Sequence, residues 1–185
     1  MRTSSAYRVV AATAALVLLA ACTDEPAPTP TPPAPTTSGN AACPAPGVAL
    51  TAGPVDAAAG LRAMRVEMAN CGSQPYTVDG YPALRVLGAD RAPLAVTTAE
   101  GTARISSIAG FDKPPQPVTL APGDRAAAVV VWRNTVTDGN TPATTGTHLE
   151  VAPAAGQPAQ VLSPAGGLDL GTTGTIATSP WVAES

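Results

Sequence analysis

The chain has 185 residues, of which ten are basic and thirteen acidic, giving a formal net charge of −3. This balance argues against nucleic-acid binding, which depends on Lys and Arg side chains that neutralise phosphates, and against electrostatic docking to anionic lipids. After residue 42 there is room for one domain of about 140 residues.

The first 21 residues have the pattern of an export signal. Arg2 and Arg8 form a positive start, and residues 9–21 form an apolar run without any charge. That run is about 13 residues long, whereas a helix needs roughly 20 residues to span a bilayer. The pattern therefore predicts a cleavable signal peptide rather than a transmembrane helix.

The string Leu19-Ala20-Ala21-Cys22 closes this segment. It resembles the lipobox of bacterial lipoproteins, and the resemblance implies that the Cys22 thiol is lipidated and that cleavage falls just before it. Two acyl chains give stable anchoring where one is marginal. Loss of residues 1–21 would lower the net charge from −3 to −5. An ordinary secretory signal with an incidental cysteine is the alternative.

Residues 22–42 predict an extended tether. Six prolines lie between residues 26 and 35, interleaved with Ala and Thr. Prolines at this density favour polyproline II, which extends by about 3.1 Å per residue. We expect a stalk that holds the domain up to ~60 Å from the bilayer; a leader of no particular length is the alternative.

Cys43 and Cys71 remain as an even pair once Cys22 is assigned to lipid. In an exported protein the default for such a pair is a disulfide. It would close a loop of about 29 residues and stabilise the folded state by about 3–4 kcal/mol. It would also join the first segment of the domain to the end of its second strand. Two free thiols or half of a metal site are the alternative, although the sequence offers no neighbouring ligands.

Residues 43–185 show period-two apolar patterning and short apolar runs between turn signals. The pattern predicts an all-β domain, an immunoglobulin-like β-sandwich of about 7–9 short strands, with a small open β-barrel as the alternative. The expected strands are 64–68, 83–87, 94–98, 103–108, 118–120, 126–133, 149–151, 161–162, 168–170 and 175–178.

Several local features of this domain are specific enough to test. We expect 83–87 and 94–98 to form a hairpin, and 126–133 to be the central strand with Trp132 buried. Pro122-Gly123 fits the centre of a type II turn. Residues 56–62 could form a single helical turn.

Longer runs of the domain resemble a known family. These are NCGSQPYTVDGYPALRVL (70–87), LAPGDRAAAVVVWRN (120–134), HLEVAP (148–153) and SPW (179–181). They are similar to domain of unknown function 4232, found in secreted proteins and lipoproteins of actinobacteria, over roughly residues 43–181. The resemblance implies an extracytoplasmic sandwich and implies no activity.

The sequence offers little catalytic or metal-binding chemistry. His148 is the only histidine, so we expect neither a catalytic triad nor a blue-copper site. Lys113 is the only lysine; we expect it to be an ordinary loop residue, and a Ser-Lys dyad is the alternative. Glu67, Glu100 and Glu150 have the spacing of outward strand or turn residues, although paired carboxylates acting on a glycoside remain an alternative. We predict no catalytic residue, no metal and no cofactor; residues 138–140 have the pattern of a turn rather than a calcium loop.

Recognition of a partner is the remaining class of function. Few aromatic residues are available for a sugar platform, so loops 108–117 and 134–147 are the first places to look for a binding surface. We expect a non-catalytic domain, lipid-anchored on the extracytoplasmic face of the cell membrane, that binds an envelope protein or ligand. An envelope-acting enzyme or inhibitor, and a structural envelope protein without a specific ligand, are the alternatives.

Overall fold

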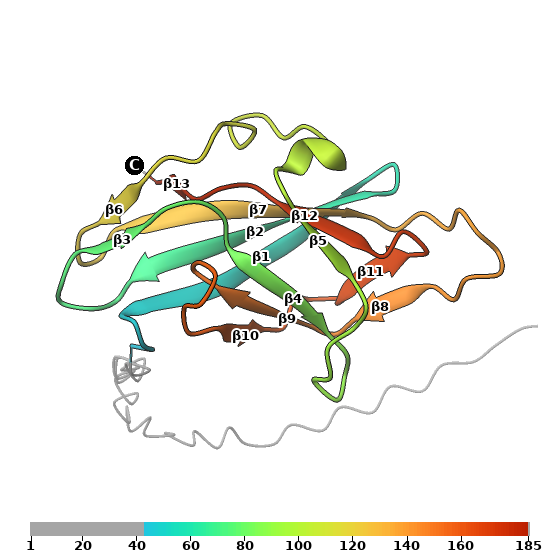
Figure 1. Ribbon diagram of the computed structural model, residues 1–185, viewed down its shortest axis with the longest axis horizontal. Coiled ribbons are helices and arrows are strands. Elements are labelled where there is room, and N and C mark those ends of the chain that lie inside the picture. Colours follow the sequence, from blue (N-terminus) through green and yellow to red (C-terminus); the bar gives the residue numbers. More distant parts are fainter. Residues whose placement is uncertain (1–42, 185) are drawn as a thin grey trace, which may run out of the picture. The chain divides into compact units, whose positions relative to one another are not determined.

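The computed structural model describes residues 43–184, and its regular structure is almost entirely β-strand (Figure 1). The expected signal peptide (1–21), Cys22 and the tether (22–42) lie outside the described residues. Within residues 43–184, no helix is long and apolar enough to cross a membrane. The strands are β1 (Val48–Ala58), β2 (Leu61–Asn70), β3 (Tyr76–Val78), β4 (Ala83–Leu87), β5 (Thr97–Glu100), β6 (Val118–Leu120), β7 (Arg125–Arg133), β8 (Thr144–Gly146), β9 (His148–Ala152), β10 (Gln160–Leu162), β11 (Leu168–Gly171), β12 (Thr175–Thr178) and β13 (Val182–Ala183).

The larger sheet has the strand order β1-β2-β7-β12-β5, and β13 continues the pairing along β7 beyond β12. Its pairs are antiparallel except β12 with β5, which is parallel. Every residue of β7 from Ala126 to Trp132 is buried. The prediction of a central strand at 126–133 is therefore confirmed, including the burial of Trp132.

A smaller sheet, β10-β9-β4, faces the larger one across the main core (Figure 1). Met64, Val66 and Trp132 of the larger sheet pack there with Leu149 and Val151 of β9. Two further pairs, β11-β8 and β3-β6, complete the strand pairing. Residues 43–184 thus form a β-sandwich without a closed barrel, and the predicted fold class is confirmed, with thirteen strands in place of the expected 7–9.

Both tryptophans are held in this core through their indole N–H groups. Trp181, 2 % exposed, donates to the carbonyl of Pro153 at 2.7 Å. Trp132 donates to Oδ1 of Asp169 at 3.1 Å. A buried indole needs such a partner because an unsatisfied N–H costs about 1–3 kcal/mol.

The helical turn expected at 56–62 is wrong, because β1 and β2 form one long hairpin through this segment. Ala58 pairs with Leu61, and the two central residues, Ala59 and Gly60, have φ values of 45° and 78°. Positive φ at both positions is typical of a type I′ turn, whose twist matches the flanking strands. Ala-Gly is a weak signal for that turn because Asn or Asp usually takes the first position.

The hairpin expected between 83–87 and 94–98 is also wrong. β4 pairs with β9 along its whole length, while β5 lies in the other sheet beside β12. The reversal after β4 does begin as a hairpin, with a bridge between Leu87 and Pro93. The N–H of Leu94 still donates to the carbonyl of Val86 at 2.9 Å, but that of Val96 turns back to the carbonyl of Leu94 at 2.8 Å, and the chain then crosses to the larger sheet.

The free edge of β1 is partly covered by a side chain from the smaller sheet. Oε1 of Gln160 accepts a hydrogen bond from the backbone N–H of Leu50 at 3.0 Å, and its Nε2 donates to the carbonyl of Val48 at 2.9 Å. The amide therefore satisfies backbone groups that a neighbouring strand would otherwise pair. Such cover protects an edge strand from adding another chain.

The predicted pairing of Cys43 with Cys71 is present as a disulfide. Cys71 directly follows the last residue of β2, and its N–H also donates to the carbonyl of Gly47 at 3.1 Å. The bond therefore joins the start of the domain to the end of its second strand, as expected. The turn at Pro122-Gly123 is confirmed too: Asp124 N–H reaches the carbonyl of Ala121 at 2.9 Å, with Gly123 at φ 91°.

Candidate binding surface

Residues 101–117, which we call the strap, connect β5 to β6 over the outer face of the larger sheet (Figure 1). The strap begins at Gly101, whose N–H donates to the carbonyl of Thr178 at 2.8 Å. A 3₁₀ helix, η1 (Thr102–Arg104), follows. The strand expected at 103–108 is therefore wrong. Ile105 and Ile108 are three residues apart and both pack on the sheet, which a strand's alternation would not allow.

The strap covers apolar residues that alternate with the main core along β7. Val129 and Val131 point to the outer face and are buried there by Ile105, Ile108 and Phe111 of the strap. This explains why β7 is apolar on both faces although only one face contacts the smaller sheet. The strap is thus the third layer of the domain at this position.

Asp112 fixes the shape of the strap by accepting hydrogen bonds from within it. Its Oδ2 accepts the N–H of Ile108 at 2.7 Å, and its Oδ1 is hydrogen-bonded to the hydroxyl of Thr102. The pKa of the Asp112 carboxyl lies below its ordinary value, chiefly because of the hydrogen bond from Thr102. Desolvation raises this pKa, and the bonds from Ile108 and Ser107 lower it further. The strap is therefore a defined loop held by an ionised carboxylate.

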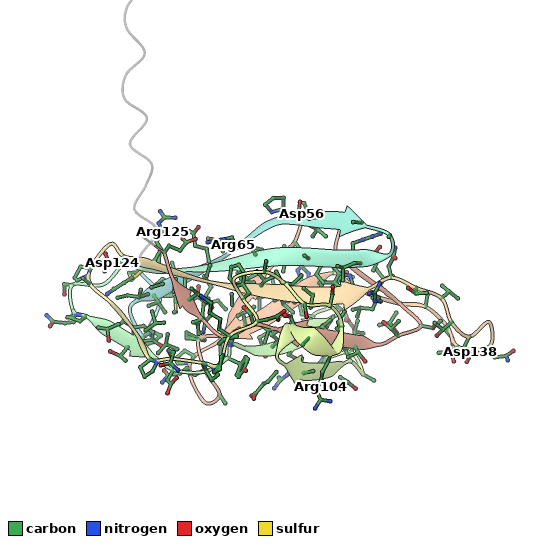
Figure 2. The ribbon with its side chains drawn as sticks, turned by 90° about the horizontal axis from the view of Figure 1, so that it is seen from above. Asp56, Arg65, Arg104, Asp124, Arg125 and Asp138 are labelled. Atoms are coloured by element: carbon green, nitrogen blue, oxygen red, sulfur yellow. A yellow bond between two sulfur atoms is a disulfide. The ribbon has the colours of Figure 1, made fainter. Side chains whose placement is uncertain are left out.

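Phe111, in the middle of the strap, is linked through Arg65 to Glu184 near the C-terminus. The guanidinium of Arg65 on β2 lies over the ring of Phe111, 5.8 Å from its centroid, and forms an ion pair with Glu184. A cation over an aromatic ring gains about 0.5–1 kcal/mol at exposed sites. Figure 2 shows Arg65 on the same side of the domain as Arg125, which pairs with Glu67.

A basic depression of about 260 Å³ lies at the η1 end of the strap. It combines two arginines with two threonines and one isoleucine, brought together from the strap, the end of β7 and the turn into β12. Figure 2 shows Arg104 extending outward from the helix. The lining residues are Arg104, Ile105, Arg133, Thr173 and Thr175.

An apolar depression of about 160 Å³ lies at the other end of the strap. The chain around Trp181 forms one wall, and the proline-rich end of the strap forms the other. The expected search region 108–117 therefore does lie beside surface hollows. The lining residues are Lys113, Pro114, Gln116, Val118, Pro180, Trp181, Val182 and Ala183.

His148 does not belong to a triad in the described structure. It is half-buried at the start of β9, and its Nδ1 lies 2.9 Å from Oγ of Ser163. Within residues 43–184 no carboxylate is hydrogen-bonded to the ring, whereas a triad needs an acid to orient the imidazole. The neighbouring Glu150 pairs instead with Arg85 at 3.3 Å.

Lys113 and the other glutamates are likewise separate from one another. Lys113 lines the apolar depression, in which no serine takes part. Glu67 forms an ion pair with Arg125, and Glu100 is exposed in β5. These side chains do not converge on one cavity.

Residues 138–140 form a turn at the tip of the loop between β7 and β8, and Figure 2 shows Asp138 there, far from η1. The carboxylate of Asp138 accepts the N–H of Asn140 at 2.9 Å and bonds the hydroxyl of Thr141. The bond from Thr141 is the largest cause lowering the pKa of Asp138. No cluster of three or more His, Cys, Asp or Glu side chains suited to a metal occurs within residues 43–184.

Sequence patterning does not indicate the basic depression. The pattern predicts a strand over 103–108, which contains Arg104, and makes Arg133 only the end of the central strand. One signal was available: Arg133 is the first charged residue after a long buried run, so it must leave the sheet surface close to the strand end. The strap's path over that end is a tertiary feature that local patterning does not contain.

The fold and the surface together define a disulfide-linked β-sandwich with a strap across one sheet. A model of the family described as Domain of unknown function (DUF4232) matches residues 43–182. The chain belongs to this family, and the resemblance found in its sequence is confirmed. No curated protein and no solved structure matches the chain.

Proposed function

We propose that this protein is a non-catalytic binding domain held on the extracytoplasmic face of the membrane by lipid on Cys22, and that the strap is its binding face. The observation that carries the binding role is the strap itself. It places a basic and an apolar depression at the two ends of one ordered loop. Loops positioned by a rigid scaffold are where binding function concentrates.

The proposed location is supported by the disulfide and by the sequence ahead of it. Disulfides persist in oxidising compartments and are rare in the cytosol, and Cys43–Cys71 closes the start of the sandwich. The lipobox and the proline-rich segment precede that point. An exported, lipid-anchored domain on a spacer accounts for all three features.

Membrane fractionation of the full chain tests the anchor. We expect the wild type in the membrane fraction, with a mature N-terminus at a lipid-modified Cys22 by mass spectrometry. Cys22→Ala should lose the modification and the new N-terminus. A wild-type chain that begins elsewhere, with an unmodified Cys22, would overturn the anchor.

Site-specific photocrosslinking in intact cells tests the binding face. A photoreactive residue replaces Lys113 on the strap in one variant and, in the control, Asp56, which is exposed on β1 away from η1 (Figure 2). We expect one discrete protein adduct from position 113 and none from position 56. If neither position gives a discrete adduct, a structural envelope protein without a specific ligand becomes the better description.

A hydrolase is the second candidate, and the contact between His148 and Ser163 favours it. Against it, no carboxylate among residues 43–184 is hydrogen-bonded to the ring, and the pair lies outside both strap depressions. Labelling with a fluorophosphonate probe distinguishes the two: a serine hydrolase would be labelled at Ser163, with the label lost in His148→Ala. We expect no labelling of the wild type.

A further inference from the structure

We propose that the basic depression between η1 and the end of β7 is a binding site for a small oxyanion, a carboxylate or phosphate group held by Arg104 and Arg133. This inference deepens the proposed function, because it names the chemistry that one end of the strap would recognise. It rests on the charge pairing, the geometry and the size of the depression.

The first argument is charge pairing. Four arginines of residues 43–184 form ion pairs with carboxylates: Arg62 with Asp169, Arg65 with Glu184, Arg85 with Glu150 and Arg125 with Glu67. Arg104 and Arg133 form none with any carboxylate of the described range, yet they line one depression, which contains no acidic residue. On a domain whose overall charge is acidic, this is a local concentration of unneutralised positive charge.

The second argument is that nearby carboxylates are committed elsewhere. Trp132 and Arg133 are neighbours on β7, so their side chains leave opposite faces of the sheet. Asp169 is bonded to Trp132 and Arg62, and is therefore engaged at the core-facing side. Asp112 of the strap is engaged by Thr102 and Ile108.

The third argument concerns the donors that remain free. Nη2 of Arg133 donates to the carbonyl of Ile105 at 3.4 Å, a long bond that uses one of the five N–H groups of the guanidinium. The Thr173 hydroxyl donates to the carbonyls of Leu170 and Arg133, at 2.8 and 3.0 Å. Thr173 therefore helps to position the backbone at Arg133, while the two guanidinium groups supply the donors for a ligand.

The chemistry and size of the depression select the ligand class. Guanidinium forks match carboxylate and phosphate oxygens in bidentate geometry. The volume of about 260 Å³ suits a small molecule rather than a polymer, and Ile105 offers a contact for a short apolar part. Free phosphate and a small aliphatic carboxylate are the two probes that follow.

The experiment is a titration of the full chain in neutral detergent at fixed ionic strength, followed by NMR. Saturation transfer reports propionate, and ³¹P line broadening reports inorganic phosphate. The test variant is Arg104→Gln combined with Arg133→Gln. The control is Arg91→Gln, an exposed arginine that lines neither depression and forms no ion pair with a described carboxylate. Circular dichroism checks that each variant is folded.

We expect saturable binding of at least one probe by the wild type and the control, weakened at least tenfold in the double variant. The stronger probe then identifies the ligand as carboxylate or phosphate. No saturable binding of either probe, or equal loss in the double variant and in Arg91→Gln, would overturn the site. Neither result bears on membrane attachment or on crosslinking at Lys113, so the proposed function can fail or stand separately.

Discussion

Asn70 is the buried polar residue on which the turn after β2 depends. It is 2 % exposed; its Nδ2 donates to the carbonyls of Gln74 and Leu120, both at 2.9 Å, and its Oδ1 accepts the N–H of Gly72 at 3.0 Å. The side chain thus replaces the backbone partners that a regular strand would provide. It directly precedes Cys71, which forms the disulfide with Cys43.

Asn70→Ala should lower the free energy of unfolding by about 2–3 kcal/mol, because the carbonyl of Leu120 loses a buried hydrogen bond and the carbonyl of Gln74 a partly buried one. Urea denaturation measures the change. Asn140→Ala is the control: its side chain is exposed and only its backbone N–H is bonded, so the change should stay within about 0.5 kcal/mol. Equal effects of the two substitutions would contradict this account of Asn70.

Asp169 is the second residue whose chemistry the fold determines. Burial raises its pKa, but hydrogen bonds from Trp132, Arg62 and Asn134, with the charge of Arg62, outweigh burial, so the pKa lies below its ordinary value. A depressed carboxyl pKa stabilises the folded state fully above the unfolded pKa of about 3.9. That contribution is lost as the pH falls through the folded pKa.

Asp169→Asn should therefore lower the free energy of unfolding by on the order of 1 kcal/mol at pH 7, a figure reduced for the partial exposure of the group. The difference from wild type should shrink as the pH falls below about 4. Urea denaturation at pH 7 and pH 3 measures both values. If the difference in free energy of unfolding stays constant, or grows in acid, the charge of the Asp169 carboxylate is not what stabilises the folded state.

At the level of elements, the end of β11 lies close against the backbone that follows β7. Gly171 has φ 57°, and a Cβ there would lie 2.4 Å from the carbonyl oxygen of Thr135. Neither the backbone conformation nor the space allows a side chain. This contact helps to place Thr173 beneath the basic depression.

Gly171→Ala should destabilise the domain by more than about 1 kcal/mol, because the conformation is strained and backbone must move. Thermal unfolding measures the change. Gly139→Ala is the matched control, since its φ is not positive and nothing lies within 4 Å of its Cβ position. A neutral Gly171→Ala would mean that the turn shifts without effect on the strands it joins.

Some of these elements can be predicted from the local sequence pattern, and others cannot. β7 and the turn at Pro122-Gly123 were predictable because a long apolar run and a Pro-Gly pair are strong local signals. The partner of β4 was not, because the local ladder ends after Leu94 and β4 pairs instead with β9, far along the chain. The basic depression depends on that same crossover, since the strap exists only because β5 joins the larger sheet.

At the scale of the whole molecule, the larger sheet is covered on both faces by different means. The smaller sheet covers the core side, and a single loop, the strap, covers the outer side around Val129 and Val131. A loop contributes less buried area than a sheet. Detaching the strap from the larger sheet should therefore need less free energy than detaching the smaller sheet. It would expose the apolar surface around Val129 and Val131.

Phe111→Ala should weaken the cover and the contact with Arg65, lowering the free energy of unfolding by about 1–2 kcal/mol. It should also raise the binding of a hydrophobic dye to the folded domain. Val136→Ala, at a site 63 % exposed, should change neither measurement. Unchanged dye binding in Phe111→Ala would show that the rest of the strap shields the sheet without this ring.

The position of the Cys43–Cys71 bond has a mechanical consequence. A pull on the chain ahead of Cys43 passes through the sulfur atoms to Cys71, so the load bypasses the closed segment that contains β1 and β2. With the bond oxidised, β1 cannot be peeled from the sheet edge by that force. Reduction would send the load into the β1 ladder, where pairs open one after another, and the domain would yield at lower force in a single-molecule stretching experiment.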